Sequence, residues 1–285
     1  MINLKMVLAI FLKEMLAITS WIVLFGMTYS DSHATGNRSA ISSPAETLTA
    51  KALELYNRID FSQHQQLRKE VFVKAYTGYK NLNKNGMIQG SKNMLSICDF
   101  ALSSKEPRLW VIDLDSAKVL FNIHVAHGAG TGEEYARNFS NRPNSHQSSL
   151  GFYLTGNTYQ GGNGYSLRLY GMDTGYNDRA AERAIVMHGA PYVSEHFVKS
   201  NNRIGRSWGC PAIPQAMTMP VINTIKNGTC LFLFSDNQEY LKASKWLKAY
   251  PAESIPHGVL PIPNNAQSDQ EPHQMDEAAE AKLNG

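Results

Sequence analysis

One cysteine of the chain stands in a segment whose residue types suit a nucleophile. Cys210 lies between Gly209 and Pro211, and residues 206–211 read Arg-Ser-Trp-Gly-Cys-Pro. Gly209 has no side chain, so the backbone can turn tightly there and another group can approach the sulfur closely. Pro211 biases the residue before it away from helical geometry. The pattern predicts that Cys210 is presented in a turn at the end of a strand.

An acyl-transfer site in this turn also needs hydrogen-bond donors for the oxyanion that forms when a carbonyl is attacked. Since proline has no N–H, these donors must be the amides of Trp208, Gly209 or Cys210. Each such amide is typically worth about 3 kcal/mol of the barrier. Ser207 precedes them and is expected either to shape the turn or to assist the catalytic base.

A cysteine nucleophile needs a base, because a free thiol has a pKa of about 8.5 and is mostly protonated at neutral pH. His188 follows the apolar run 184–187 and precedes Gly189, which is expected to open space beside the ring. An imidazole within about 3 Å of the sulfur would form a thiolate–imidazolium pair. The intervening residues 189–209 are long enough for a loop that brings His188 to Cys210.

Some of these residue types also have ordinary structural roles. Cys98 and Cys230 fall within apolar segments, where a free cysteine is commonly a small buried hydrophobe. They could instead form one disulfide, which would leave Cys210 as the free thiol. His188 could be a hydrogen-bonded histidine of the core. The polar and angular neighbours of Cys210 favour a nucleophile over a packing role.

Metal and nucleotide chemistry have weaker support. Zinc ligands by type are His124, His127, His188, His196 and Cys210. His124 and His127 are three residues apart on a predicted strand, which would point them to opposite faces. The glycine-rich run 128–132 lacks the lysine and helix that follow a nucleotide-binding loop, so a flexible turn is expected there. No cofactor and no metal are therefore expected.

The helical elements are predicted from apolar periodicity and from capping residues. Ser43 and Pro44 open a helix with an apolar stripe that runs to Ile59. Ser62 and Gln65 form a second capping box before another stripe, and Asn85-Gly86 ends that helix. These two helices are expected to form a hairpin beside the main domain. Further helices are expected over 214–226 and, behind the cap Asp236, over 239–249.

Strand character dominates after residue 94. Alternating or continuous apolar runs predict strands, while the polar stretch 127–149 is expected to be a loop and a candidate lid. The fold class is therefore mainly β with accessory helices (α+β). The predicted strands cover 95–102, 109–114, 119–126, 150–155, 165–170, 184–187 and 229–234.

Composition and charge define the ends of the chain. Of 285 residues, 43% are apolar and 18% charged, an ordinary globular balance. Lys5 and Lys13 precede an apolar stretch, so residues 1–34 are expected to be a secretory signal, cleaved or kept as an anchor. Residues 251–285 are expected to be a disordered acidic tail that contains prolines. The body between them is basic but has no Lys/Arg run, so nucleic acid is not an expected partner.

Together, His188-Gly189 and Ser207-Trp208-Gly209-Cys210 resemble the L,D-transpeptidase family, most closely its murein L,D-transpeptidase catalytic branch. The branch pattern Gly-Arg-Ser-x-Gly-Cys-Pro-Ala fits residues 205–212. The resemblance runs from about residue 108 to residue 235. Further matching segments are 139–141, 148–153 and 183–190.

The resemblance implies a fold, a reaction and a location. The fold would be a mixed β-sandwich core over 91–250, preceded by the helical hairpin in 35–90. The reaction would be acyl transfer on peptidoglycan stem peptides, as donor and as acceptor, in the periplasm or cell envelope of a bacterium. Any membrane contact would come from an uncleaved signal alone. The catalytic residues would be Cys210 and His188, with Gly209, Trp208 and Ser207 at the oxyanion turn and with substrate contacts from Arg206, Gly189, Tyr192 and His127.

The sequence departs from the family pattern beside the cysteine, and alternatives stay open. Better-known members have His where Trp208 stands and Arg or Asn where Ala212 stands, so the substrate contacts of those positions do not carry over. Water as acceptor would give an L,D-carboxypeptidase, and another cell-wall cysteine peptidase would cleave stems without joining them. A non-catalytic wall-binding protein is the third alternative.

Overall fold

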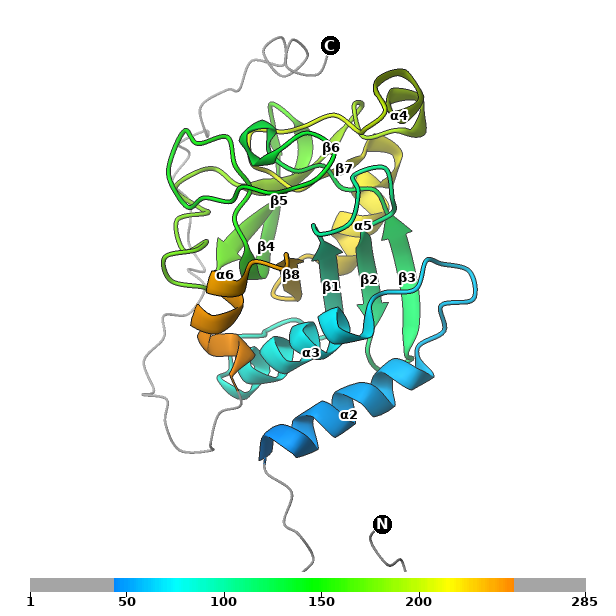
Figure 1. Ribbon diagram of the computed structural model, residues 1–285, viewed down its shortest axis with the longest axis vertical. Helices are drawn as coiled ribbons and strands as arrows, with labels where there is room; N and C mark the ends of the chain where they lie inside the picture. The colour runs from blue at the N-terminus through cyan, green and yellow to red at the C-terminus, as the bar shows by residue number, and fades with distance from the viewer. Residues whose placement is uncertain (1–43, 249–285) are drawn as a thin grey trace, which may run out of the picture. The chain divides into compact units, whose positions relative to one another are not determined.

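A computed structural model describes residues 44–248 of the chain (Figure 1). The predicted signal segment 1–34 and the predicted tail 251–285 lie outside these residues. Among the residues described, no helix has both the length and the apolar character needed to cross a bilayer.

Eight strands join into one hydrogen-bonded sheet in the order β3-β2-β1-β8-β4-β5-β6-β7. Most neighbouring strands are antiparallel, while the pairs β1–β8 and β6–β7 are parallel. The mainly β fold with accessory helices is thereby confirmed (Figure 1). The strands are β1 Met94–Asp99, β2 Leu109–Asp113, β3 Lys118–Ile123, β4 Gly151–Gly161, β5 Gly164–Gly171, β6 Val186–Ala190, β7 Ala212–Pro214 and β8 Cys230–Phe234.

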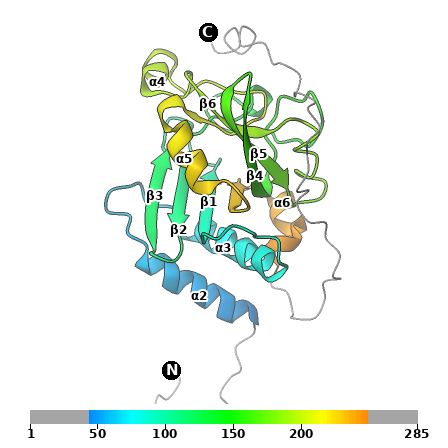
Figure 2. The same cartoon turned by 180° about the vertical axis from the view of Figure 1, so that it is seen from behind.

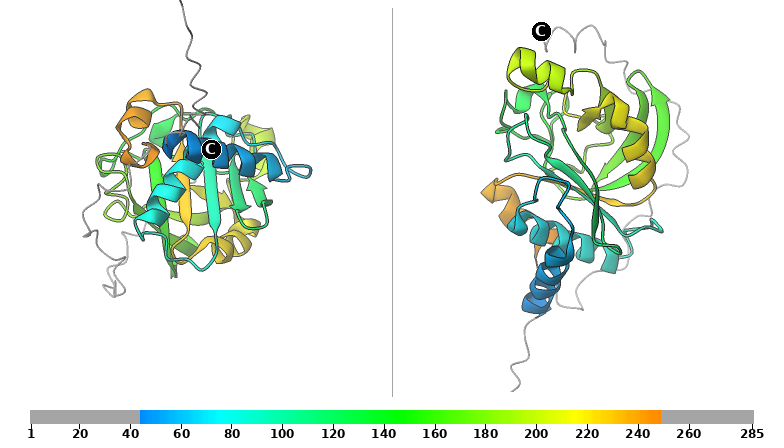
Figure 3. Two further views of the ribbon diagram at one scale, coloured as in Figure 1. Left: turned by 90° about the horizontal axis from the view of Figure 1, so that it is seen from below. Right: turned by 90° about the vertical axis from the view of Figure 1, so that its right-hand side faces the viewer.

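The helices lie on different parts of this sheet. Helix α3 contacts β1 and β8, whereas α5 contacts β5 and β6 from the side seen in Figure 2. In space, α2 and α4 lie at opposite ends of the folded residues 44–248, as the right-hand view of Figure 3 shows. The helices are α2 Pro44–Arg58, α3 Lys69–Lys84, α4 Glu195–Asn201, α5 Thr218–Ile225 and α6 Gln238–Ala243, with short 3-10 turns at 129–131, 215–217 and 245–247.

The two N-terminal helices pack on each other, as their apolar stripes predict. Tyr56 of α2 lies against Phe72 of α3, with ring centroids 5.5 Å apart. The capping box at Ser62 is wrong, however, because α3 begins only at Lys69. Tertiary hydrogen bonds hold the preceding segment extended: the Gln65 amide donates to Asn122 (3.1 Å), and its carbonyl accepts the indole N–H of Trp110 (2.7 Å).

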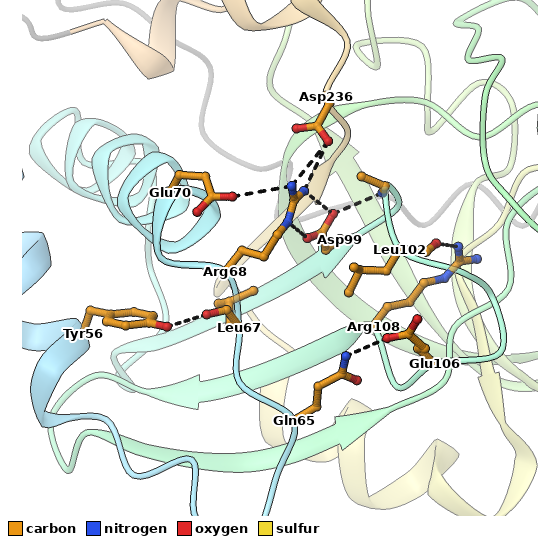
Figure 4. A network of polar contacts seen from close by, with 11 residues as sticks. Tyr56, Gln65, Leu67, Arg68, Glu70, Asp99, Leu102, Glu106, Arg108 and Asp236 are labelled. Carbon is orange, nitrogen blue, oxygen red and sulfur yellow. Dashed lines mark hydrogen bonds and ion pairs between the residues drawn. The ribbon is translucent and has the colours of Figure 1, made fainter.

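A charged network fastens the start of α3 to the sheet (Figure 4). Arg68 donates two hydrogen bonds, of 2.7 and 3.0 Å, to the carboxylate of Asp99 at the end of β1. Its guanidinium also reaches Asp236, just after β8, at 3.4 Å. Burial raises the pKa of Asp99, although the Arg68 charge opposes this rise. The helical pair is therefore tied to the central strands by charge as well as by apolar contact.

The structure corrects several predicted boundaries. Strand β6 starts at Val186 rather than 184, because Ile185 donates to the Ala180 carbonyl and closes a turn (2.9 Å). Helix α6 is capped by Asn237, whose side chain accepts from the Tyr240 amide, and it ends at Ala243 rather than 249. Strand β7 and helix α4 were not expected from the sequence; β7 has three residues and ends in proline, so it carries no strand periodicity.

All three cysteines are free thiols. Cys98 and Cys230 lie on the adjacent strands β1 and β8, where Cys230 pairs with Leu95. Cys98 is therefore three positions further along, about 10 Å of strand, whereas a disulfide needs Cα atoms within about 7 Å. The alternative of a Cys98–Cys230 disulfide is wrong, and burial raises the pKa of both thiols.

Candidate active site

The sulfur of Cys210 sits against the backbone at the start of β6. Cys210 is 2% exposed, and the Val186 N–H lies 3.5 Å from its Sγ atom. The thiol in turn points to the Ala184 carbonyl oxygen at 3.7 Å. Ala184 has a φ of 53°, an uncommon value for a residue with a side chain. The sulfur is thus flanked by one backbone N–H and one backbone carbonyl oxygen.

His188 lies within β6, in the strand next to the segment that carries Cys210. It pairs with Ala212 of the parallel strand β7, two residues after Cys210. Its Nδ1 atom lies 3.0 Å from the Gly189 carbonyl oxygen. Because a carbonyl oxygen only accepts, Nδ1 carries the proton and Nε2 carries the lone pair.

The electrostatics of His188 match this tautomer. The residue is 1% exposed, and its Nε2 atom makes no hydrogen bond within residues 44–248. Burial lowers the pKa of His188, while the bond to Gly189 partly opposes this. The ring is therefore neutral at pH 7 and presents an unused basic nitrogen.

Ser207 shapes the turn that leads to Cys210. Its hydroxyl donates to the Cys210 carbonyl at 2.6 Å and accepts the Gly209 N–H at 3.1 Å. The expected role of Ser207 as a turn former agrees with this geometry. The Gly209 amide, expected as an oxyanion donor, is instead occupied by the serine hydroxyl in this conformation.

Gly209 is required by both its backbone angle and its surroundings. Its φ is 120°, and a Cβ atom there would lie 2.8 Å from the Gln147 carbonyl oxygen and 3.0 Å from the Ile185 side chain. The hydroxyl of Ser148 donates to the Gly209 carbonyl (3.2 Å) and accepts from the Gly128 amide (3.0 Å). The long loop 127–149 is thus packed directly onto the cysteine turn.

Arg183 is the residue that sequence reasoning missed. Its guanidinium donates to the carbonyls of Ser140 (2.7 Å) and Gln147 (2.7 Å), and to the hydroxyls of Ser145 (3.1 Å) and Ser149. One side chain before β6 therefore holds the last ten residues of the loop. The sequence signal was present, because Arg183 opens the matching segment 183–190, but its partners are set by the fold.

Two further side chains act electrostatically on Cys210. Burial lowers the pKa of Arg183, and negative charge on Tyr153 and Cys210 opposes that shift. Burial raises the pKa of Tyr159, and charge on Cys210 raises it further. Arg183 is therefore a positively charged neighbour of Cys210. Tyr159, from β4, is a second neighbour that the sequence did not reveal.

The indole of Trp208 faces the loop rather than the core. It stacks on His146, with ring centroids 4.6 Å apart and an interplanar angle of 8°. Its Nε1 atom is buried and makes no hydrogen bond within the described part of the chain. His146 has a φ of 52°, so the loop backbone is held in an unusual conformation under the stack.

The remaining expected substrate contacts have other partners. Gly189 opens no space beside the imidazole, because the side chain of Thr218 fills the position that a Cβ would take. Tyr192 is 9% exposed and packs in a small apolar cluster with Ile204 and Ala212. Arg206 forms an ion pair with Glu133, at 2.5 Å.

His127 is enclosed by protein on both ring nitrogens. Arg108 donates to its Nδ1 atom (2.7 Å), so Nε2–H donates to the Gly132 carbonyl (3.2 Å). Burial, helped by the charge of Arg108, lowers the pKa of His127 to about 3. These contacts indicate a structural role that anchors the loop beside the site.

The residues weighed as zinc ligands do not come together. Within residues 44–248, no group of three or more His, Cys, Asp or Glu side chains is arranged to hold a metal ion. His124 bonds to the Lys105 carbonyl at 2.8 Å, and His196 lies in α4.

Comparisons with solved structures found distant likenesses. An L,D-transpeptidase from Mycobacterium smegmatis is 12% identical, over 50% of this chain and 59% of that chain, with a TM-score of 0.31. The helical cell shape determining protein Pgp2 from Campylobacter jejuni is 12% identical, over 58% and 55%, with a TM-score of 0.34. The chain thus spans less than two thirds of either relative.

A third solved structure is also similar to this chain, and a family model matches its sequence. An L,D-transpeptidase from Xylanimonas cellulosilytica is 12% identical, over 66% of this chain and 93% of that chain, with a TM-score of 0.29. No curated protein matches the chain. A family model described as L,D-transpeptidase catalytic domain matches residues 63–234, from the segment before α3 to the end of β8. This match covers more than half of the sequence, and the chain therefore belongs to the L,D-transpeptidase catalytic domain family.

Proposed function

We propose that this chain is a cysteine-dependent acyltransferase that acts on peptidoglycan stem peptides in the cell envelope. The observation that carries the proposal is the state of His188. Its Nδ1 proton is held by the Gly189 carbonyl at 3.0 Å, and its buried Nε2 atom keeps an unused lone pair. The pairing of His188 with Ala212, two residues after Cys210, supports the assignment of this base to the Cys210 thiol.

The first half-reaction forms a thioester. The Cys210 thiol gives its proton to His188 Nε2, and the thiolate attacks the carbonyl between the L-centre of a diamino acid and the terminal D-alanine. The C–N bond of that amide then breaks, and His188 Nε2–H protonates the departing D-alanine amine. In the second half-reaction an acceptor amine attacks the thioester and His188 Nε2 takes its proton. The C–S bond then breaks, and His188 returns that proton to the sulfur, so that Cys210 leaves as the thiol.

The tetrahedral intermediate needs N–H donors for its oxyanion. We assign the Cys210 amide as one donor to this oxyanion. The Gly209 amide joins it only after the Ser207 hydroxyl, which now accepts that N–H at 3.1 Å, rotates away. A donor of this kind typically contributes about 3 kcal/mol, so this rotation matters for the rate.

The experiment is digestion analysis of purified sacculi after incubation with the protein. Crosslinked dimers with release of D-alanine support acyl transfer, whereas shortened monomers alone support a carboxypeptidase or endopeptidase. Cys210→Ala should abolish product at unchanged fold. Cys230→Ala is the matched control, because Cys230 is a buried free thiol in β8 with no part in this chemistry.

A second measurement separates an enzyme from a wall-binding protein. An activated Cys210 should be labelled by iodoacetamide near pH 6–7 faster than Cys98, whose thiol pKa is raised by burial. Product formation by Cys210→Ala at the wild-type yield would reject the mechanism. Equal, slow labelling of both thiols together with absence of any product would favour the non-catalytic alternative.

A further inference from the structure

Two arginines beside the cysteine turn converge on one carboxylate. Arg203 Nε lies 3.1 Å from one oxygen of Glu133, and Arg206 Nη1 lies 2.5 Å from the other. Each guanidinium takes a different oxygen, so the carboxylate is bound from both sides. Each arginine makes one charge-assisted contact, so the two together supply a donor to each carboxylate oxygen.

The two arginines are held in place, whereas the acid is not. The side chains of Arg203 and Arg206 are 14% and 11% exposed, but that of Glu133 is 72% exposed. Arg203 also donates to the Ile204 carbonyl (3.0 Å) and lies over the Phe197 ring, 6.0 Å from its centroid. Arg206 also donates to the Gly132 carbonyl (3.3 Å). Fixed donors around a solvent-exposed carboxylate form a site whose occupant can leave at little cost.

Charge in this region favours a further anion. Burial lowers the pKa of Arg203, the neighbouring Arg206 lowers it further, and Glu133 opposes both. Lys105 lies close by, bonded to Asn202, the residue before Arg203 (3.3 Å). Lys105 pairs with Glu134, the residue after Glu133, at 3.1 Å. Within residues 44–248, the ion pairs of this region thus join three cations, Lys105, Arg203 and Arg206, to the two neighbouring acids Glu133 and Glu134.

This site is near the sulfur along the chain. Arg206 directly precedes Ser207, whose amide donates to the His127 carbonyl (3.0 Å) and whose hydroxyl bonds to Cys210. Four residues span at most about 14 Å, so the Arg206 backbone lies within that distance of Cys210. A carboxylate close to the scissile bond of a bound peptide would therefore lie in the neighbourhood of these arginines.

We propose that Arg203 and Arg206 bind a carboxylate of the donor peptide, and that Glu133 occupies their site until the peptide displaces it. This inference rests on the proposed function and adds a recognition site with a built-in competitor. An exposed ion pair is typically worth 0–1 kcal/mol, so the peptide displaces Glu133 easily. When no peptide is bound, the Glu133 carboxylate compensates part of the charge of the two arginines.

Binding of a stem tetrapeptide to Cys210→Ala protein, measured by calorimetry, tests the proposal without turnover. The peptide ends in a diamino acid and D-alanine and is compared with forms in which each carboxylate is amidated in turn. One amidated form should bind about tenfold more weakly, as loss of a charged hydrogen bond predicts. When Arg203→Gln is combined with Cys210→Ala, the free-acid peptide should bind no more tightly than that amidated form. The affinity for the amidated form should stay unchanged.

Glu133→Gln gives a second test, in which the proposal predicts the direction of the change in peptide affinity. Removing the competitor should tighten binding of the free-acid peptide about two- to fivefold, and should not change binding of the sensitive amidated form. Glu134→Gln is the matched control, because that neighbouring acid pairs with Lys105 and Ser103 instead. Arg179→Gln, at an exposed arginine paired with Glu182, controls for loss of positive charge.

The outcomes separate this inference from the function on which it rests. If the protein binds the peptides but Arg203→Gln keeps the full preference for the free acid, the recognition site is wrong and the proposed function stands. If neither form binds and wild-type protein forms no product, the proposed function fails, and the recognition site fails with it. Weaker binding of the free acid by Glu133→Gln would overturn the competitor role alone.

Discussion

At the scale of single residues, the proposed reaction depends on which His188 nitrogen holds the proton. The Gly189 carbonyl fixes the proton on Nδ1, and burial keeps the whole ring neutral. A solvated imidazole would be half protonated near pH 6.5, and the protonated half could not accept the thiol proton. Burial of His188 therefore widens the pH range in which the base works.

The acid limb of the pH–rate profile measures this effect. Since the pKa of His188 is lowered, His188 stays deprotonated as pH falls to 6.5, and kcat/KM should decline only at lower pH. The profile should be recorded by release of D-alanine between pH 4.5 and 8. A decline already centred above pH 6.5 would show that the imidazole is not the buried neutral base proposed.

Gly209→Ala tests the close contact between the loop and the cysteine turn. The new Cβ would be strained by the φ of 120° and would press on the Gln147 carbonyl oxygen. Such strain and overpacking cost about 1–3 kcal/mol each, so the variant should lose activity and melt at a lower temperature. Gly175→Ala is the control, since Gly175 also has positive φ (81°) but open space around it. Equal losses in the two variants would show that backbone strain alone matters at residue 209.

The two side chains proposed to react stand out in the sequence, whereas the residues that support them do not. Cys210 and His188 each stand beside a glycine in a short local pattern, which the sequence displays directly. Arg183 donates hydrogen bonds to four loop residues because residues 140–149 lie against it in the folded chain. No local sequence pattern predicts these contacts. Gly189 was misread for the same reason, since the Thr218 side chain that fills its space comes from α5.

At the scale of elements, the loop 127–149 behaves as a fixed wall of the site. Its first part is tied to the cysteine turn through Ala129, whose amide donates to the Ser207 carbonyl at 2.7 Å. Its last part is bound by the Arg183 guanidinium. The loop was expected as a possible lid, and these bonds make any opening depend on release of Arg183.

Arg183→Gln should therefore loosen the loop and weaken catalysis together. Hydrogen bonds from a charged donor are each worth about 1.5–3 kcal/mol, so we expect kcat/KM to fall at least tenfold. Amide exchange of residues 140–149 should become faster, which loss of charge alone would not cause. Arg179→Gln is again the control, because Arg179 pairs with Glu182 at the surface. Unchanged exchange in the loop would contradict this positioning role.

The elements themselves were predictable where the apolar pattern is long. The stripe of α3, including Val71, Ala75 and Leu82, is buried as its spacing predicts. The short elements β7 and α4 were not predicted. Strand β7 forms because its three residues pair with β6. Helix α4 begins where the Ser194 side chain accepts a hydrogen bond from the Phe197 amide. The start of α3 was misplaced because bonds of Gln65 to distant residues outweigh a local capping signal.

At the scale of the whole molecule, the core contains a charged group beside a neutral histidine. Arg108 is fully buried, and its guanidinium donates to the carbonyls of Leu102 (2.9 Å) and Val125 (3.0 Å) as well as to His127. It also lies over the Phe100 ring, 5.1 Å from the centroid. These contacts join the β1–β2 connection to the start of the loop that covers the cysteine turn. Protonation of His127 would place a second positive charge against Arg108, which links the stability of this region to pH.

His127→Gln measures that link between pH and global stability. The pKa of His127 is about 3 in the folded chain and about 6.5 when unfolded. The unfolded state therefore binds the extra proton below pH 6.5, and the free energy of unfolding falls by up to about 1.4 kcal/mol per pH unit as pH drops. Glutamine can still accept from Arg108 but does not titrate, so the variant should be less stable than wild type at pH 7.5 and close that gap by pH 5. Denaturant unfolding at both pH values checks this, because other titrating groups are common to the two proteins. Parallel pH dependences would mean that His127 does not stay neutral in the folded core.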